Sequence, residues 1–109
     1  MRKDLEHTFS EYLDKEMQNK LFVRFVFSED FNKIDAFAVS LISTIREKPR
    51  EIIRFDASIR ERINVHKFYS KPIIKQYLNK EKCFKTLEEF IENIRENWII
   101  YRLEYEENY

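Results

Sequence analysis

The segments EIIRFD (residues 51–56) and INVHKFY (residues 63–69) decide the fold of this chain. In both, polar residues largely alternate with apolar ones, which is the pattern of a strand with one buried face. The polar stretch at residues 57–61 suits a loop. We therefore expect an antiparallel hairpin with strands over residues 51–56 and 62–69.

The two faces of this hairpin predict its register. We expect Asp56 opposite Arg62, so that Arg54 faces Asn64. One face is then apolar near the loop, and the other carries Arg54, Asp56, Arg62, Asn64 and His66. A shift by one residue would mix the two faces, which a half-buried sheet disfavours.

Three further segments extend the expected sheet. LFVRFVF (residues 21–27) is dense in aromatic and β-branched residues, as central strands are. Residues 34–45 fit a helix or a strand by periodicity alone, and their β-branched residues favour the strand. Lys48 and Pro49 predict the turn that follows it. Residues 73–78 read as a last, short strand.

Helices are expected at both ends of the chain. Apolar residues at intervals of four predict an opening helix over residues 3–18, namely Leu5, Phe9, Leu13 and Met17. Thr86 and Glu89 form a capping-box pattern that predicts the start of a long C-terminal helix. That helix has one apolar stripe, Leu87, Phe90, Ile91, Ile94, Trp98, Tyr101 and Tyr105, and we expect its last residues, 106–109, to fray.

The expected architecture is a single α+β domain over residues 1–109. It comprises an N-terminal helix, an antiparallel meander sheet of four or five strands, and a long C-terminal helix packed on the sheet. Turns must form without glycine, which the chain lacks, so we expect type I rather than primed turns.

Composition narrows the classes of function. Twenty basic residues balance twenty acidic ones, so no global charge attracts nucleic acid or a membrane. The absence of glycine excludes glycine-rich phosphate loops and dinucleotide fingerprints. The single cysteine, Cys83, and the lack of a leader-like start favour the cytoplasm. We expect no membrane association, no cofactor and no metal site.

Arg54, Asp56 and His66 are the candidate catalytic residues. A cation, a carboxylate and an imidazole on one face could stabilise phosphate charge and move a proton. A simpler interpretation is a cross-strand ion pair between Asp56 and Arg62, with His66 at a strand edge. Cys83 is a weaker candidate nucleophile, because a lone cysteine before a helix is more often a packing residue.

Basic residues crowd the loops between residues 46 and 85, whereas residues 86–109 are mostly acidic. With aromatic residues nearby, such loops could bind single-stranded RNA by phosphate contacts and stacking. Arg60, Arg62 and Lys67 are the candidate nucleic-acid-binding residues. Interspersed glutamates give the alternative interpretation of a solvated rim.

The order of three segments resembles a known family: FAVSLISTIREKPREIIRFD (residues 37–56), VHKFY (65–69) and ENWIIYRLEY (96–105). They resemble the TumE-like small domains of archaea and bacteria and related families, some of them toxin components of toxin–antitoxin pairs. The resemblance spans about residues 34–105. It implies a hairpin followed by a C-terminal helix.

In that family an arginine, an aromatic residue and an aspartate precede a His-Gly step and a histidine-containing strand. Arg54, Phe55, Asp56 and His66 occupy those positions in this chain. The chain lacks the His-Gly step, and Asn64 stands where a further histidine is common. These departures favour binding over cleavage.

Two hypotheses follow, and the residues leave open whether the protein is an enzyme. The leading one is a small cytoplasmic interaction protein that resembles the TumE-like component of a toxin–antitoxin pair. Its partner would be a small protein or a second copy of the chain, at apolar surface left over from the core. The alternative is an RNA-binding protein or a metal-independent ribonuclease that uses Arg54, Asp56 and His66.

Overall fold

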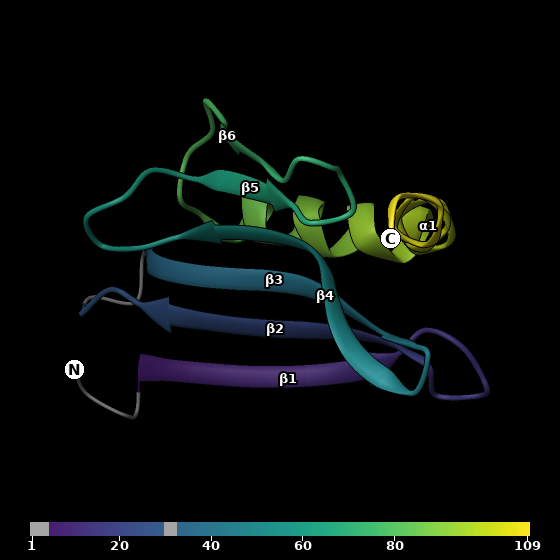
Figure 1. The fold of residues 1–109 in the computed structure, drawn as a ribbon. Coiled ribbons are helices and arrows are strands. Elements are labelled where there is room, and N and C mark those ends of the chain that lie inside the picture. Colours follow the sequence, from purple (N-terminus) through teal and green to yellow (C-terminus); the bar gives the residue numbers. More distant parts are fainter. Residues whose placement is uncertain (1–4, 30–32) are drawn as a thin grey trace.

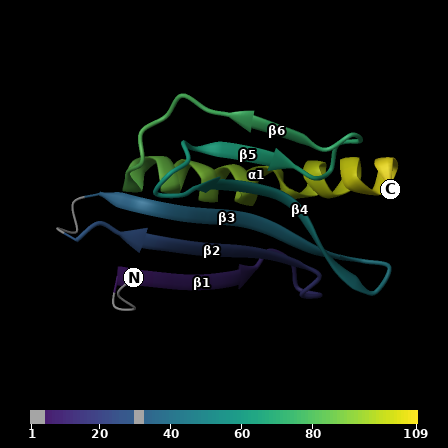
Figure 2. The same ribbon diagram turned by 60° about the vertical axis from the view of Figure 1, so that its left-hand side comes forward.

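The computed structural model describes residues 5–29 and 33–109, which form six strands and one helix. The elements are β1 (Glu6–Tyr12), β2 (Asn19–Phe27), β3 (Ile34–Ile45), β4 (Lys48–Ala57), β5 (Asn64–Lys67), β6 (Ile74–Tyr77) and α1 (Phe84–Asn108). The strands form one sheet in the order β1-β2-β3-β4-β5-β6, with every neighbouring pair antiparallel. The helix α1 lies across one face of this sheet (Figures 1 and 2). The predicted α+β class, the meander and the C-terminal helix are confirmed, and the sheet has more strands than expected.

The predicted N-terminal helix is wrong over the residues that the structure describes. Residues 6–12 form strand β1, which pairs along its whole length with β2. The Asp14 carboxylate accepts the backbone N–H groups of Gln18 and Asn19, at 3.1 and 2.8 Å from Oδ1, and closes the turn between the two strands. The apolar spacing of four residues misled the prediction, because residues four apart share a face in a strand as well as in a helix.

The hairpin between β3 and β4 turns at Arg46 and Glu47, not at the predicted Lys48 and Pro49. Both turn residues have positive φ, 50° and 69°, which is the φ pattern of a type I′ turn. The expectation that a chain without glycine avoids primed turns is therefore wrong here. The right-handed twist of the two long strands favours this turn, at a conformational cost of about 1–2 kcal/mol per residue.

The register between β4 and β5 differs from the prediction by two residues. Arg54 lies opposite His66, and Asp56 lies opposite Asn64. A shift of two keeps every side chain on its predicted face, so the hydrophobic pattern cannot distinguish the two registers. The register depends instead on the connection at residues 58–63, which is longer than the predicted loop.

The core lies between the sheet and α1. Phe90 of the helix stacks on Phe55 of β4, with ring centroids 4.3 Å apart, and also contacts Phe37 of β3. Ile94 is fully buried, as the predicted stripe requires. Each such side chain stabilises the fold by about 1.5–3 kcal/mol. No helix in the described part of the chain is long and apolar enough to cross a membrane.

Both ends of α1 differ from the prediction. The helix begins at Phe84, with Cys83 at the N-cap position and no side-chain cap, so the predicted capping box does not form. Its last turn is held in place rather than frayed. Asn108 Nδ2 donates to the Tyr69 carbonyl over 2.8 Å, and Tyr109 Oη donates to the Ser70 carbonyl over 2.6 Å.

Candidate functional site

Arg54, Asp56 and His66 lie together on the sheet face that points away from α1. Side chains alternate along β4, so Phe55 packs on Phe90 of the helix while Arg54 and Asp56 point to the other side. His66 is the direct partner of Arg54 in the neighbouring strand. The three predicted candidate residues therefore form one cluster, as the sequence indicated.

Asp56 links the other two residues. Arg54 Nε donates to Asp56 Oδ2 over 2.7 Å, and His66 Nε2 lies 3.4 Å from the same oxygen. Arg54 Nη1 also donates to Glu51 Oε1 over 2.8 Å. The other oxygen of Glu51 accepts a hydrogen bond from Ser40 Oγ over 2.9 Å. Two carboxylates thus neutralise one guanidinium.

The ring of Phe68 shields this cluster. His66 stacks on it with centroids 5.6 Å apart and an interplanar angle of 10°. The guanidinium carbon of Arg54 lies 5.3 Å from the same centroid. Only 20% of the Asp56 side chain and 17% of the His66 side chain are exposed. Partial burial of this kind strengthens the electrostatic interactions within the cluster.

The chemistry open to the cluster follows from these contacts. His66 and Asp56 form a pair that can hold and transfer a proton. Arg54 already serves two carboxylates, so a bound phosphate would compete with them for it. The expected ion pair between Asp56 and Arg62 does not form. The Arg62 guanidinium lies over the Tyr77 ring instead, 4.8 Å from its centroid.

The predicted nucleic-acid-binding residues do not form one group. Arg60 and Arg62 line a hollow of about 300 Å³ with Lys80 and Lys82, between the β4–β5 connection and the segment that precedes α1. Lys67 is the last residue of β5 and lies apart from this hollow. The structure brings Arg60 and Arg62 together and separates them from Lys67.

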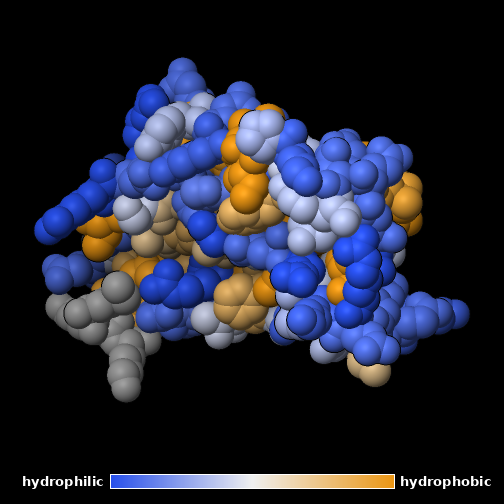
Figure 3. All heavy atoms as spheres, viewed as in Figure 1, coloured by the Kyte–Doolittle hydropathy of each residue, from blue (hydrophilic) through white to orange (hydrophobic). Residues whose placement is uncertain are grey.

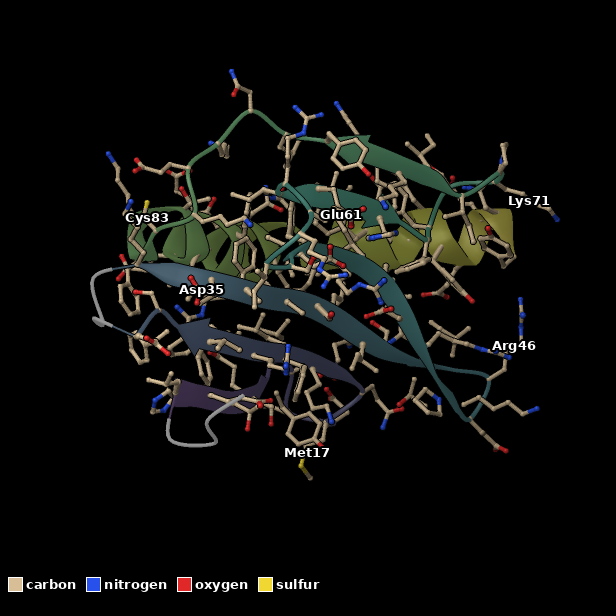
Figure 4. The ribbon with its side chains drawn as sticks, turned by 90° about the vertical axis from the view of Figure 1, so that its left-hand side faces the viewer. Met17, Asp35, Arg46, Glu61, Lys71 and Cys83 are labelled. Atoms are coloured by element: carbon tan, nitrogen blue, oxygen red, sulfur yellow. The ribbon has the colours of Figure 1, made fainter. Side chains whose placement is uncertain are left out.

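Glu61, which Figure 4 labels beside β5, is the acidic residue of the same region. Lys75 Nζ and Tyr77 Oη each donate to Glu61 Oε2 over 3.0 Å. These hydrogen bonds, that of Lys75 first, lower the pKa of Glu61 below 4.5. The bond to Glu61 in turn raises the pKa of Lys75 above 10.5. The contacts fix β6 to the β4–β5 connection.

Outside the polar cluster, the groups to consider in the described residues are metal ligands and the thiol of Cys83. No group of three or more His, Cys, Asp or Glu side chains in these residues could hold a metal ion. The polar contact of Cys83 is with Thr86 rather than with His66, and joins Sγ to Oγ1 over 3.5 Å. Hydrogen bonding by Thr86 lowers the pKa of the thiol below 9.0.

A second basic site lies at the hairpin between β3 and β4, within the basic range of residues 46–85 but outside the candidate nucleic-acid-binding residues Arg60, Arg62 and Lys67. Two hollows, of about 390 and 310 Å³, lie between this hairpin and the end of α1, and both are lined by Arg50, Tyr105 and Tyr109. We call them together the hairpin groove; Arg46 and Lys48 line the larger hollow, and Phe68 the smaller. The cations of REKPR (residues 46–50) were a signal for it. The sequence did not indicate that these cations lie beside Tyr105 and Tyr109 at the end of α1.

The fold and the polar cluster define an α+β protein with a meander sheet, one covering helix and a polar site on the opposite face. No protein-family model matches the chain. Neither a curated protein nor a solved structure shows detectable similarity to it.

Proposed function

We propose that this protein binds a second, small protein, as the component of a toxin–antitoxin pair that the resemblance to TumE-like domains implies. The supporting observation is apolar surface on the outer side of α1. Ile99, Ile100 and Leu103 are 56, 55 and 54% exposed, on the side of the helix opposite the stripe that packs on the sheet. Adjacent exposed side chains of this size are typical of interaction surfaces.

This α1 apolar patch (Ile99, Ile100 and Leu103) has acidic surroundings. Glu96 and Glu107 lie one helical turn before and after it, and neither forms an ion pair in the described part of the chain. Hydrophobic atoms are visible at the edge of the molecule where α1 lies, among mostly hydrophilic ones (Figure 3). The partner that complements this surface is a basic segment with apolar anchors, such as an amphipathic helix. A second copy would place like charges against one another.

Co-expression with the small protein encoded beside this gene tests the proposal. We expect a one-to-one complex by size-exclusion chromatography with light scattering. The double substitution Ile100→Glu with Leu103→Glu should abolish it, because it buries charge among apolar anchors. Ile59→Glu is the matched control, since Ile59 is 69% exposed outside the helix.

The proposal also predicts an effect on growth. Expression of this chain alone should slow growth, and the partner should relieve the effect only while the α1 apolar patch is intact. A complex that persists in the double variant would contradict the proposed surface. A dimer of this chain without the partner, lost in the same variant, would identify a second copy as the occupant.

The second candidate function is RNA binding or metal-independent RNA cleavage by Arg54, Asp56 and His66. The observation that favours it is the 3.4 Å approach of His66 to Asp56 beside the Phe68 ring. His66→Ala should then abolish binding or cleavage of a labelled RNA, and His7→Ala, at the other histidine, should not. RNA activity unchanged in His66→Ala, with an unchanged circular dichroism spectrum, would remove His66 from the site.

A further inference from the structure

The hairpin groove lies at the end of the molecule where α1 terminates. Arg46 projects there from the β3–β4 turn and Lys71 from the β5–β6 turn, on either side of the last turn of the helix (Figure 4). Arg50, Tyr105 and Tyr109 line both hollows. Each hollow is within the size range of pockets for small ligands.

None of the cations of this groove is paired with a carboxylate side chain among the residues that the structure describes. Lys48 and Arg50 form no side-chain hydrogen bond or ion pair in the described part of the chain. Arg46 Nη2 donates to the main-chain oxygen of Tyr109 over 3.0 Å, and Lys71 Nζ lies 5.5 Å from the centroid of the Tyr109 ring. Elsewhere in the same residues, cations such as Arg54 are paired with carboxylates. The hairpin groove therefore carries net positive charge that is available to an anion.

The nearest acidic lining residue does not cancel this charge. Glu51 lines the smaller hollow, and its carboxylate already accepts hydrogen bonds from Arg54 and Ser40. The negative charge of Glu51 is therefore already balanced by Arg54 of the polar cluster. Glu47 lies between the cations of the hairpin in the sequence but lines neither hollow. The charged residues of the lining are therefore Arg46, Lys48 and Arg50 against Glu51 alone, which leaves positive charge in excess.

The aromatic residues of the groove are held in fixed positions. The rings of Tyr105 and Tyr109 stack with centroids 4.7 Å apart. Tyr109 is also anchored by the hydrogen bond of its hydroxyl to the Ser70 carbonyl and by Arg46. A fixed aromatic surface beside unpaired cations is the arrangement on which nucleic-acid bases stack while their phosphates are neutralised.

We propose that the hairpin groove binds single-stranded nucleic acid. Lys48 and Arg50 contact successive phosphates. A base stacks on the Tyr109 ring in place of the Lys71 ammonium, which moves from the ring to a phosphate. Two hollows that share one cation suit a polymer with a repeating charge. An acidic peptide would satisfy the cations but would not use the aromatic surface. This site is separate from the α1 apolar patch. Its smaller hollow adjoins the polar cluster through Glu51 and Phe68, but Arg54, Asp56 and His66 line neither hollow.

Fluorescence anisotropy with labelled oligo(U) and oligo(dT) of about twelve nucleotides tests the proposal. We expect saturable binding that weakens between about 50 and 200 mM salt, with a log–log slope of about −0.7 for each phosphate contacted. Arg50→Glu should weaken binding by roughly tenfold or more, because it replaces a phosphate contact by a repulsion. Lys85→Glu makes the same charge change at an exposed residue of the first turn of α1, and should leave binding unchanged.

Two further variants locate and identify the ligand. Tyr109→Leu should weaken binding by roughly tenfold through lost stacking. Arg60→Glu should have no effect, since Arg60 lies in the other basic hollow. Unchanged binding in Arg50→Glu, or a loss confined to Arg60→Glu, would overturn the assignment to this groove. Polyglutamate that competes as well as the oligonucleotide would identify an acidic peptide instead.

These results are independent of the protein-binding proposal. Loss of partner binding in the variants of Ile100 and Leu103 concerns only the helix surface. Loss of oligonucleotide binding in Arg50→Glu concerns only the hairpin groove. Failure of either proposal therefore leaves the other intact.

Discussion

At the scale of single residues, Asn64 is a fully buried amide whose hydrogen atoms are all committed. Its Nδ2 donates to the Asp56 carbonyl over 3.3 Å, to Glu61 Oε1 over 3.2 Å and to the Arg62 carbonyl over 3.0 Å. Its Oδ1 is buried without a partner in the described part of the chain. Position 64 therefore requires a neutral side chain that donates hydrogen bonds. The alternation of the strand requires only a polar residue there.

Asn64→Asp should destabilise the protein by about 3 kcal/mol at neutral pH. The change replaces the donor by an acceptor and buries an unpaired negative charge beside other oxygen atoms. Urea denaturation followed by circular dichroism measures the loss. Asn79→Asp is the control, because Asn79 is exposed, and a similar loss in both variants would contradict the role of the buried amide.

At the scale of elements, β6 is an edge strand whose four residues are all exposed. Its pairing with β5 is supplemented by the bonds of Lys75 and Tyr77 to Glu61. The pKa of Glu61 is lowered in the folded protein, so its contribution to stability is present above its ordinary value of 4.5. That contribution is lost as the pH falls through the lower folded value.

Titration of the Glu61 carboxyl carbon by NMR should give a midpoint below 4.5. Lys75→Met and Tyr77→Phe should each raise that midpoint, because each removes a hydrogen bond to the charged form. Added salt should reduce the effect of Lys75, since the pair is exposed. A wild-type midpoint at or above the ordinary value would contradict the contact.

Among the elements, sequence patterns predicted the strands β2 and β3 but not β1. β2 and β3 were predicted because both segments are rich in β-branched or aromatic residues, which favour strands. β1 was missed because an edge strand buries few of its residues and its apolar spacing fits two periods. Residues 6–12 form a strand because they pair with β2, and this pairing is a non-local interaction.

At the scale of the whole molecule, Arg102 joins the helix to the sheet. Its Nη1 donates to Asn19 Oδ1 over 2.9 Å, and its Nη2 donates to the Thr44 carbonyl over 3.0 Å. Asn19 is 3% exposed and also accepts a hydrogen bond from Ser43 Oγ over 2.7 Å. Arg102 lies outside the apolar stripe that the sequence predicted for the helix, and its long side chain reaches back to β2 and β3.

Arg102→Ala should lower the free energy of unfolding by about 2 kcal/mol, because it removes the charged donor from two partly buried hydrogen bonds. Arg95→Ala is the matched control on the same helix. Arg95 pairs with Glu11 and Glu92 at an exposed position, so its loss should cost less than about 1 kcal/mol. Equal losses in thermal or urea unfolding would contradict the inward role of Arg102.

The sequence by itself determined the α+β class, the central strands, the apolar stripe of α1 and the common face of Arg54, Asp56 and His66. These features depend on periodicity, which is local and fixed by side-chain chemistry. Tertiary structure alone decided the register between β4 and β5, because a shift of two residues preserves both faces. It also decided the primed turn at residues 46 and 47 and the meeting of that hairpin with the tyrosines of α1. Both depend on the twist and packing of segments that are distant in the sequence, which no local pattern encodes.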